Sequence, residues 1–181
     1  MKRSTLSLSA IALALSAGAA GADIITAEEV SPNYEPSYVS IFAGGGGETY
    51  ISGATRDGAS PEEIAAALRL PARWNPRGVT AAATAQTGPH LALIFAPESG
   101  ATPRKACAGE ARGGVAGGGD LKVLGAFCSS RGTPVSEAIL TLSGSPTPSD
   151  PDFGRRIGRL LTKLLPPSNP DFGQGCIGPG C

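Results

Sequence analysis

One segment of the sequence restricts the possible folds more than any other. Residues 90–96 form a short run in which both sets of alternating side chains are apolar. One set is Leu91, Leu93 and Phe95, and the other is Ala92, Ile94 and Ala96. A strand that is apolar on both faces must be covered on both faces. The chain is therefore expected to fold in layers around a sheet with this strand at its centre.

The remaining strand-like segments follow one another with few helices between them. Residues 38–42 and 48–52 flank a run of four glycines and predict a hairpin. Further strands are predicted at residues 79–85, 121–129 and 138–143. The sequence thus predicts an α+β fold, an antiparallel sheet of about five strands with two packed helices. A β-sandwich is the alternative, and a parallel α/β fold is disfavoured.

Two helices are predicted from their start signals. Ser60 and Glu63 can form a capping box, with Pro61 at the first helical position, and this helix is expected to reach residue 70. Asp150 and Pro151 precede a second helix that is expected to end near residue 165.

The first 22 residues have the layout of a secretory signal peptide. Lys2 and Arg3 precede an apolar run, and the small residues Ala20 and Ala22 suit a cleavage site before Asp23. The apolar run is shorter than the roughly 20 residues that span a bilayer. We therefore expect an exported protein, periplasmic or secreted after cleavage near Ala22, with no transmembrane segment in the mature chain.

Composition suggests one folded domain followed by a flexible C-terminal tail. Removing 22 of the 181 residues leaves 159, enough for a single core. We expect a signal peptide (1–22), an extended N-terminal segment (23–36), a single α+β domain (37–165) and a flexible tail rich in glycine and proline (166–181). The mature chain would carry 13 basic and 15 acidic residues, a balance that gives no reason to expect nucleic acid as a partner.

Four cysteines lie beyond the expected cleavage site. An even number in an exported chain favours disulfides over a zinc site. Three connectivities are possible, and two local bridges, Cys107–Cys128 and Cys176–Cys181, are preferred. The first would close a loop that contains a glycine-rich stretch at residues 113–119.

Several short motifs together resemble a known group of proteins. They are residues 74–78 (Trp-Asn-Pro-Arg-Gly), 90–97 (a strand ending in proline), 105–110 (with Cys-Ala-Gly-Glu), 124–128 (with Ala-Phe-Cys) and 136–138. Over about residues 70–145 the chain resembles small uncharacterised bacterial envelope proteins. The resemblance implies export and a Cys107–Cys128 pair, and it implies no mechanism.

Catalytic chemistry has few candidates in this chain. His90 is the single histidine, so a metal site with several histidines is impossible. A secreted hydrolase would have to use His90 as its general base, but no Gly-x-Ser-x-Gly motif accompanies it. The four consecutive glycines lack the Lys-Ser/Thr ending of a phosphate-binding loop, so no cofactor is expected.

The leading expectation is therefore a non-catalytic binding or envelope-associated protein. Trp74 and Arg77, in a turn, are the candidate binding residues, because tryptophan and arginine are enriched at binding hot spots. On that hypothesis Trp74→Ala abolishes partner capture and leaves the melting temperature nearly unchanged. The alternative is that Trp74 closes the edge of the core.

A basic helix face suggests one further kind of contact. Arg155, Arg156, Arg159 and Lys163 share one side of the second predicted helix. They could bind an anionic surface weakly, or they could simply be solvated.

Overall fold

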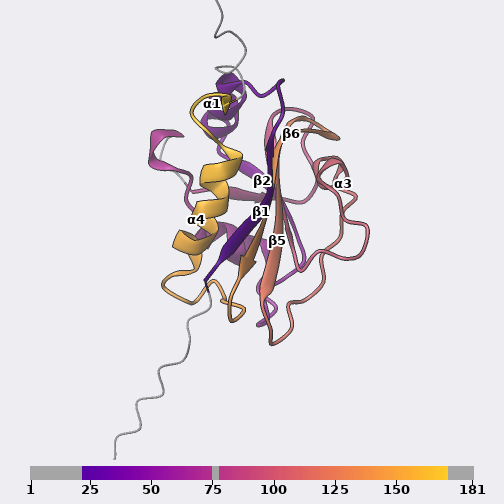
Figure 1. Ribbon diagram of the computed structural model, residues 1–181, viewed down its shortest axis with the longest axis vertical. Coiled ribbons are helices and arrows are strands. Elements are labelled where there is room, and N and C mark those ends of the chain that lie inside the picture. Colours follow the sequence, from indigo (N-terminus) through magenta and orange to yellow (C-terminus); the bar gives the residue numbers. More distant parts are fainter. Residues whose placement is uncertain (1–21, 75–77, 171–181) are drawn as a thin grey trace, which may run out of the picture.

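The computed structural model describes residues 22–74 and 78–170. Its centre is a mixed six-stranded sheet (Figure 1). The strands lie in the order β1 (Ile24–Val30), β6 (Thr133–Leu142), β5 (Leu121–Ser130), β4 (His90–Phe95), β2 (Glu48–Ser52) and β3 (Thr80–Ala82). The helices are α1 (Pro36–Gly44), α2 (Pro61–Ala67), α3 (Pro103–Ala108) and α4 (Phe153–Leu164), with a 3-10 turn at Ala72–Trp74.

The α+β class is confirmed, but the purely antiparallel sheet and the count of two helices are wrong. β2 pairs in parallel with β3 on one side and with β4 on the other. The remaining pairs, from β4 through β5 and β6 to β1, are antiparallel. The parallel part arises because α2 lies between β2 and β3 in the chain, and a crossover helix of this kind returns the chain for parallel pairing.

β4 occupies the interior position that its sequence predicts. All six of its residues are buried, and it lies between β5 and β2. Helices α1 and α4 lie on one side of the sheet and α3 on the other (Figure 1). The side chains of Leu91, Leu93 and Phe95 join the larger core with α1, α2 and α4. Those of Ala92 and Ile94 join a smaller core with α3.

A glycine lets α4 lie close against the sheet. Gly125 faces α4 from the middle of β5, and a Cβ atom there would be 2.6 Å from Cδ1 of Leu164 and 3.1 Å from Cδ2 of Leu160. The apolar stripe of α4, which includes Phe153 and Ile157, is fully buried as its spacing predicts. Phe153 stacks on Phe95 with the ring centroids 6.4 Å apart.

The predicted hairpin at residues 38–52 is wrong in its first half. Residues 36–44 form helix α1, with Pro36 in its first turn, and the glycine run follows it. The tyrosine, valine, isoleucine and phenylalanine of this segment favour strands intrinsically. Here Phe42 packs edge to face against Phe127, with ring centroids 5.7 Å apart, so tertiary contact overrides that preference.

Local capping signals explain the next two helices. In α2, Ser60 Oγ accepts a hydrogen bond from the backbone N–H of Glu63, and the backbone N–H of Ser60 donates to the Glu63 carboxylate. The capping box is confirmed, although the helix ends at Ala67 rather than near residue 70. Helix α3, which was not predicted, begins in the same way, with Thr102 as its cap and Pro103 in its first turn.

Within the N-terminal segment predicted to be extended (23–36), Ile24–Val30 form the edge strand β1. β1 pairs antiparallel with β6, and its register shifts at a bulge between Thr26 and Glu29. Asp23, just before β1, forms ion pairs with Arg156 and Arg159 of α4, which hold its carboxyl pKa below the usual range. Near the other end of the chain, the buried amide of Asn169 donates hydrogen bonds to backbone oxygens, among them that of Ser31 at 3.0 Å.

Candidate ligand-binding groove

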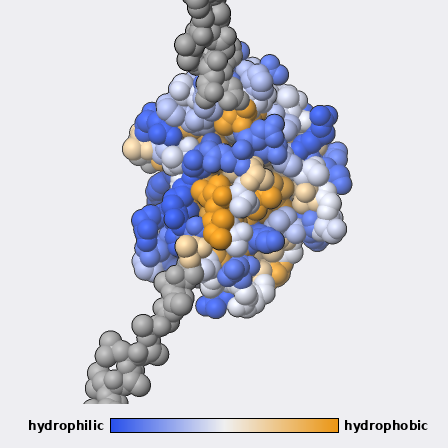
Figure 2. Space-filling model, in the orientation of Figure 1, coloured by the Kyte–Doolittle hydropathy of each residue, from blue (hydrophilic) through white to orange (hydrophobic). Residues whose placement is uncertain are grey.

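A groove of about 410 Å³ lies on the face of the sheet that carries α3. Helix α3 is bonded to β5 through Cys107 and Cys128, and the sheet farther from this disulfide, over β5, β6 and β1, is left open. The groove is lined by Thr26, Ala27, Pro97, Glu98, Ala101, Thr102, Pro103, Lys122, Leu124, Glu137, Ala138, Ile139 and Thr141. The space-filling view shows hydrophobic surface gathered around β1 in the middle of the molecule (Figure 2).

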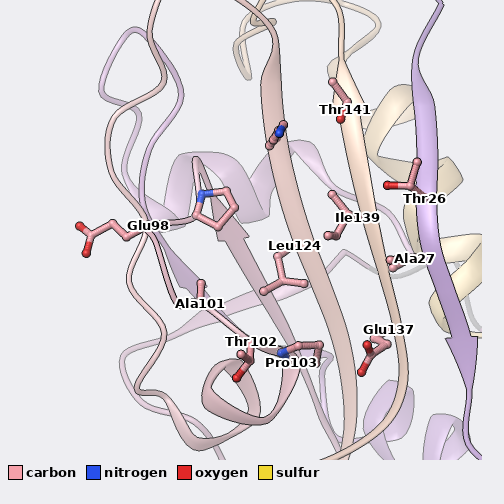
Figure 3. A pocket seen from close by; sticks show the side chains of 13 residues that line it. Thr26, Ala27, Glu98, Ala101, Thr102, Pro103, Leu124, Glu137, Ile139 and Thr141 are labelled. Carbon is pink, nitrogen blue, oxygen red and sulfur yellow. The ribbon is translucent and has the colours of Figure 1, made fainter.

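The floor of the groove is apolar and its sides carry hydroxyl groups. Leu124 and Ile139 are paired across β5 and β6, and their side chains lie between the two walls (Figure 3). One wall is the segment from Pro97 to Pro103, and the other is β1 at Thr26 and Ala27. An apolar floor with a few polar groups around it is the common character of small-molecule sites.

Strand register places charged residues at the two ends of this floor. Along β6, Thr141, Ile139 and Glu137 follow one another on the groove side, with Thr141 and Glu137 at opposite ends in Figure 3. Lys122 of β5 is paired with Thr141, so it lies at the same end of the floor as Thr141. Glu29 of β1 does not line the groove itself, but it is paired with Glu137, so two glutamates face each other at the other end.

The two glutamates are an electrostatically unfavourable pair. Burial raises the pKa of Glu137, and the nearby negative charge of Glu29 raises it further. Within residues 22–74 and 78–170, neither glutamate forms an ion pair. The charged form of Glu137 would therefore gain from a cation placed beside it.

This pair predicts a measurable dependence of stability on pH. A raised carboxyl pKa means that the folded state binds more protons than the unfolded state near that pKa, so stability falls as pH rises. Glu137→Gln removes this loss and should stabilise the protein at pH 7 by about 0.2–1 kcal/mol, as expected for like charges directly opposite on paired strands.

Thermal melts of Glu137→Gln and wild type from pH 3 to pH 8 measure this effect. The difference in stability between the variant and wild type should shrink towards acidic pH, where Glu137 is protonated in both the folded and the unfolded protein. Glu110→Gln, an exposed substitution outside the groove, is the control and should show no such trend. A Glu137→Gln variant that is less stable than wild type at pH 7 would contradict this account.

His90 is buried in the structure, with none of its surface exposed. Its Nδ1 lies 2.8 Å from the backbone oxygen of Gly88, and its Nε2 lies 3.2 Å from that of Cys107. Both ring nitrogens thus face main-chain acceptors, and no hydrogen bond to a serine or a carboxylate is found within the described part of the chain. The geometry gives His90 a structural role beside the disulfide.

Trp74 also has structural contacts. Its side chain is half-buried against the larger core, and Nε1 donates a hydrogen bond of 2.8 Å to the backbone oxygen of Leu165, just after α4. Arg77, its predicted partner in binding, lies outside the described residues. The structure thus places Trp74 between the 3-10 turn and the end of α4.

These contacts reverse the expected result for Trp74→Ala. Loss of the indole should now cost about 2 kcal/mol and lower the melting temperature by roughly 5 °C, because a partly buried ring and its hydrogen bond are both removed. Trp74→Phe, which keeps most of the apolar contact, should lose less than half as much. An unchanged melting temperature for Trp74→Ala would restore the surface-recognition hypothesis.

The four basic residues of α4 all have carboxylate partners. Arg156 and Arg159 bind Asp23, Lys163 Nζ lies 3.0 Å from Glu28, and Arg155 lies 2.8 Å from Asp152. The pKa of Arg156 is raised, chiefly by its hydrogen bond to Asp23. Three of these residues connect α4 to β1 and to Asp23 before it, which leaves the suggested contact with an anionic surface without structural support.

The Cys107–Cys128 bridge is confirmed, with 5.7 Å between the two Cα atoms. Cys176 and Cys181 lie outside the described residues. Within residues 22–74 and 78–170 no cluster of three or more potential metal ligands is found, and no helix is both long and apolar enough to cross a membrane.

Sequence reasoning missed the groove, although part of its signal was visible. Lys122, Leu124 and Ala126 alternate along a predicted strand, and a lone lysine in that alternation indicates the more open face. The pairing of Glu29 with Glu137 had no such signal, because it depends on β1 and on its bulge.

Comparisons of the chain with protein-family models, with curated proteins and with solved structures find no match. The groove itself is therefore the basis for assigning a function.

Proposed function

We propose that this chain is an exported, non-catalytic binding protein of the bacterial envelope that holds a small amphipathic ligand in the groove over β5, β6 and β1. The observation that carries the proposal is the apolar floor of half-buried Ile139 and of Leu124, which is 4% exposed, bordered by hydroxyl and charged side chains. Its volume of about 410 Å³ lies within the range of small-molecule sites.

The charges favour a ligand that carries a positive group. Glu137 and Glu29 face each other without a cation in the described part of the chain, and burial raises the pKa of Glu137. A cationic group placed between them would relieve their repulsion. The structural contacts of His90 support a binding role rather than hydrolysis.

The groove is tested with Nile red, a neutral apolar dye whose emission shifts when it leaves water. Wild-type protein should bind the dye, and Thr26→Trp or Ala101→Trp, each of which fills the groove from one wall, should weaken binding by about tenfold or more. Ile41→Trp is the control, because Ile41 is 59% exposed on α1, across the sheet from α3. Absence of dye binding to wild type, or equal binding by the filled variants, would refute the proposal.

Export is tested on the protein recovered from its native host. The proposal expects an envelope or secreted fraction in which intact mass gives a chain that begins at Asp23. Its support is the signal-peptide layout of residues 1–22, with small residues at positions 20 and 22 before Asp23. A full-length chain in the cytosol would contradict it.

A further inference from the structure

The two ends of the groove carry opposite charges, and their spacing suggests a particular class of ligand. At one end, Glu137 of β6 and Glu29 of β1 are paired across the strands. At the other end, Lys122 is exposed on β5, opposite Thr141. Within the described ranges, Lys122 forms no ion pair with a carboxylate.

Glu98 is the other acidic residue of the lining, and it does not alter this arrangement. It belongs to the segment that forms the wall opposite β1. Figure 3 shows its carboxylate directed away from Leu124 and Ile139, out of the groove. The charged groups over the floor are therefore glutamates at one end and a lysine at the other.

The distance between these ends follows from the strand register. Thr141 and Glu137 are four residues apart on β6, and a strand rises by about 3.4 Å per residue, so the two ends of the floor are about 14 Å apart. Between them the floor presents Leu124 and Ile139. An extended chain of four residues has nearly the same length, since each residue spans at most about 3.3–3.6 Å.

We infer that the ligand is a short peptide of about four residues with free ends, bound in an extended conformation. Its ammonium group lies beside Glu137 and Glu29, and its carboxylate lies beside Lys122. Alternate side chains face Leu124 and Ile139, and the hydroxyl groups of Thr26 and Thr102 on the two walls can hydrogen-bond to the peptide amides. This inference rests on the proposed function, because it assigns a ligand class to the same groove.

The test compares one peptide with its capped forms by calorimetry. Val-Ala-Val-Ala with free termini should bind, and N-acetylation or C-amidation should each weaken binding about fivefold, because each removes one terminal charge. In the double variant Glu29→Gln/Glu137→Gln, which removes both carboxylates, the acetylated and free peptides should bind equally well. In Lys122→Met the amidated and free peptides should bind equally well.

Each comparison is made within one variant, so a general loss of stability cannot imitate the result. Arg155→Met, which changes an exposed basic residue of α4 on the other side of the sheet, is the matched control and should keep both fivefold effects. Nile red binding without peptide binding, or equal binding of capped and free peptides by wild type, would refute the inference and leave the proposed function in place. Wild-type protein that does not bind Nile red would refute both the inference and the proposed function.

Discussion

Gly113→Ala should destabilise the protein by about 4 kcal/mol or more, enough to abolish most of the stability of an ordinary domain. Gly113 lies where the ends of β2 and β4 meet the glycine-rich segment. A Cβ atom there would collide with the backbone oxygen of Phe95, and would lie 2.8 Å from that of Ser52 and 2.9 Å from Cα of Gly53. All three neighbours are backbone atoms, so no side chain can move aside to relieve the overlap.

The same segment contains its own control. A Cβ atom added to Gly118 would meet no heavy atom within 4 Å beyond its chain neighbours, so Gly118→Ala should change stability by no more than about 0.5 kcal/mol. Chemical denaturation of the two variants measures the difference, and soluble yield reports it if Gly113→Ala does not fold. A melting temperature for Gly113→Ala within about 2 °C of wild type would contradict the close packing described here.

Removal of the Cys107–Cys128 bridge should have the second-largest effect. The bridge joins residues 21 positions apart, and chain-entropy arguments give about 3 kcal/mol for a loop of this size. The loop begins at Cys107, at the end of α3, so the bridge ties this helix, which forms one boundary of the groove, to β5. The double variant Cys107→Ser/Cys128→Ser should therefore melt roughly 10 °C lower and should also bind Nile red more weakly.

Reduction of the wild-type protein is the parallel experiment. Dithiothreitol should lower its melting temperature by a similar amount and leave that of the double serine variant unchanged. An equally stable reduced wild type would show that the bridge adds nothing to the fold.

The sequence predicted the elements whose signals are local and strong. The run at residues 90–96 became the fully buried β4, and the Ser60–Glu63 capping box became the start of α2. The same kind of signal, a hydroxyl residue followed by proline, was present at Thr102 and Pro103 and was missed there. Gly109, in the left-handed conformation, ends that helix and was a second missed signal.

The errors fall where distant contacts decide the outcome. Residues 38–42 favour strands locally, yet they fold as a helix because Phe42 and Val39 pack into the core on the α4 side of the sheet. β1 was not predicted because its pairing with β6 joins segments more than 100 residues apart. The groove depends on that pairing, so its position could not be predicted before the sheet order was known.

The most direct test of the account is methyl NMR of the folded protein during titration with isopropanol, a minimal apolar probe. The account predicts that the methyl signals of Leu124 and Ile139, on the groove floor, shift first and saturably. Those of Leu160 and Leu164, on the buried face of α4 across the sheet, should not move. Saturable shifts confined to Ile41 on α1, with none at Leu124 or Ile139, would contradict the assignment of the groove as the ligand site.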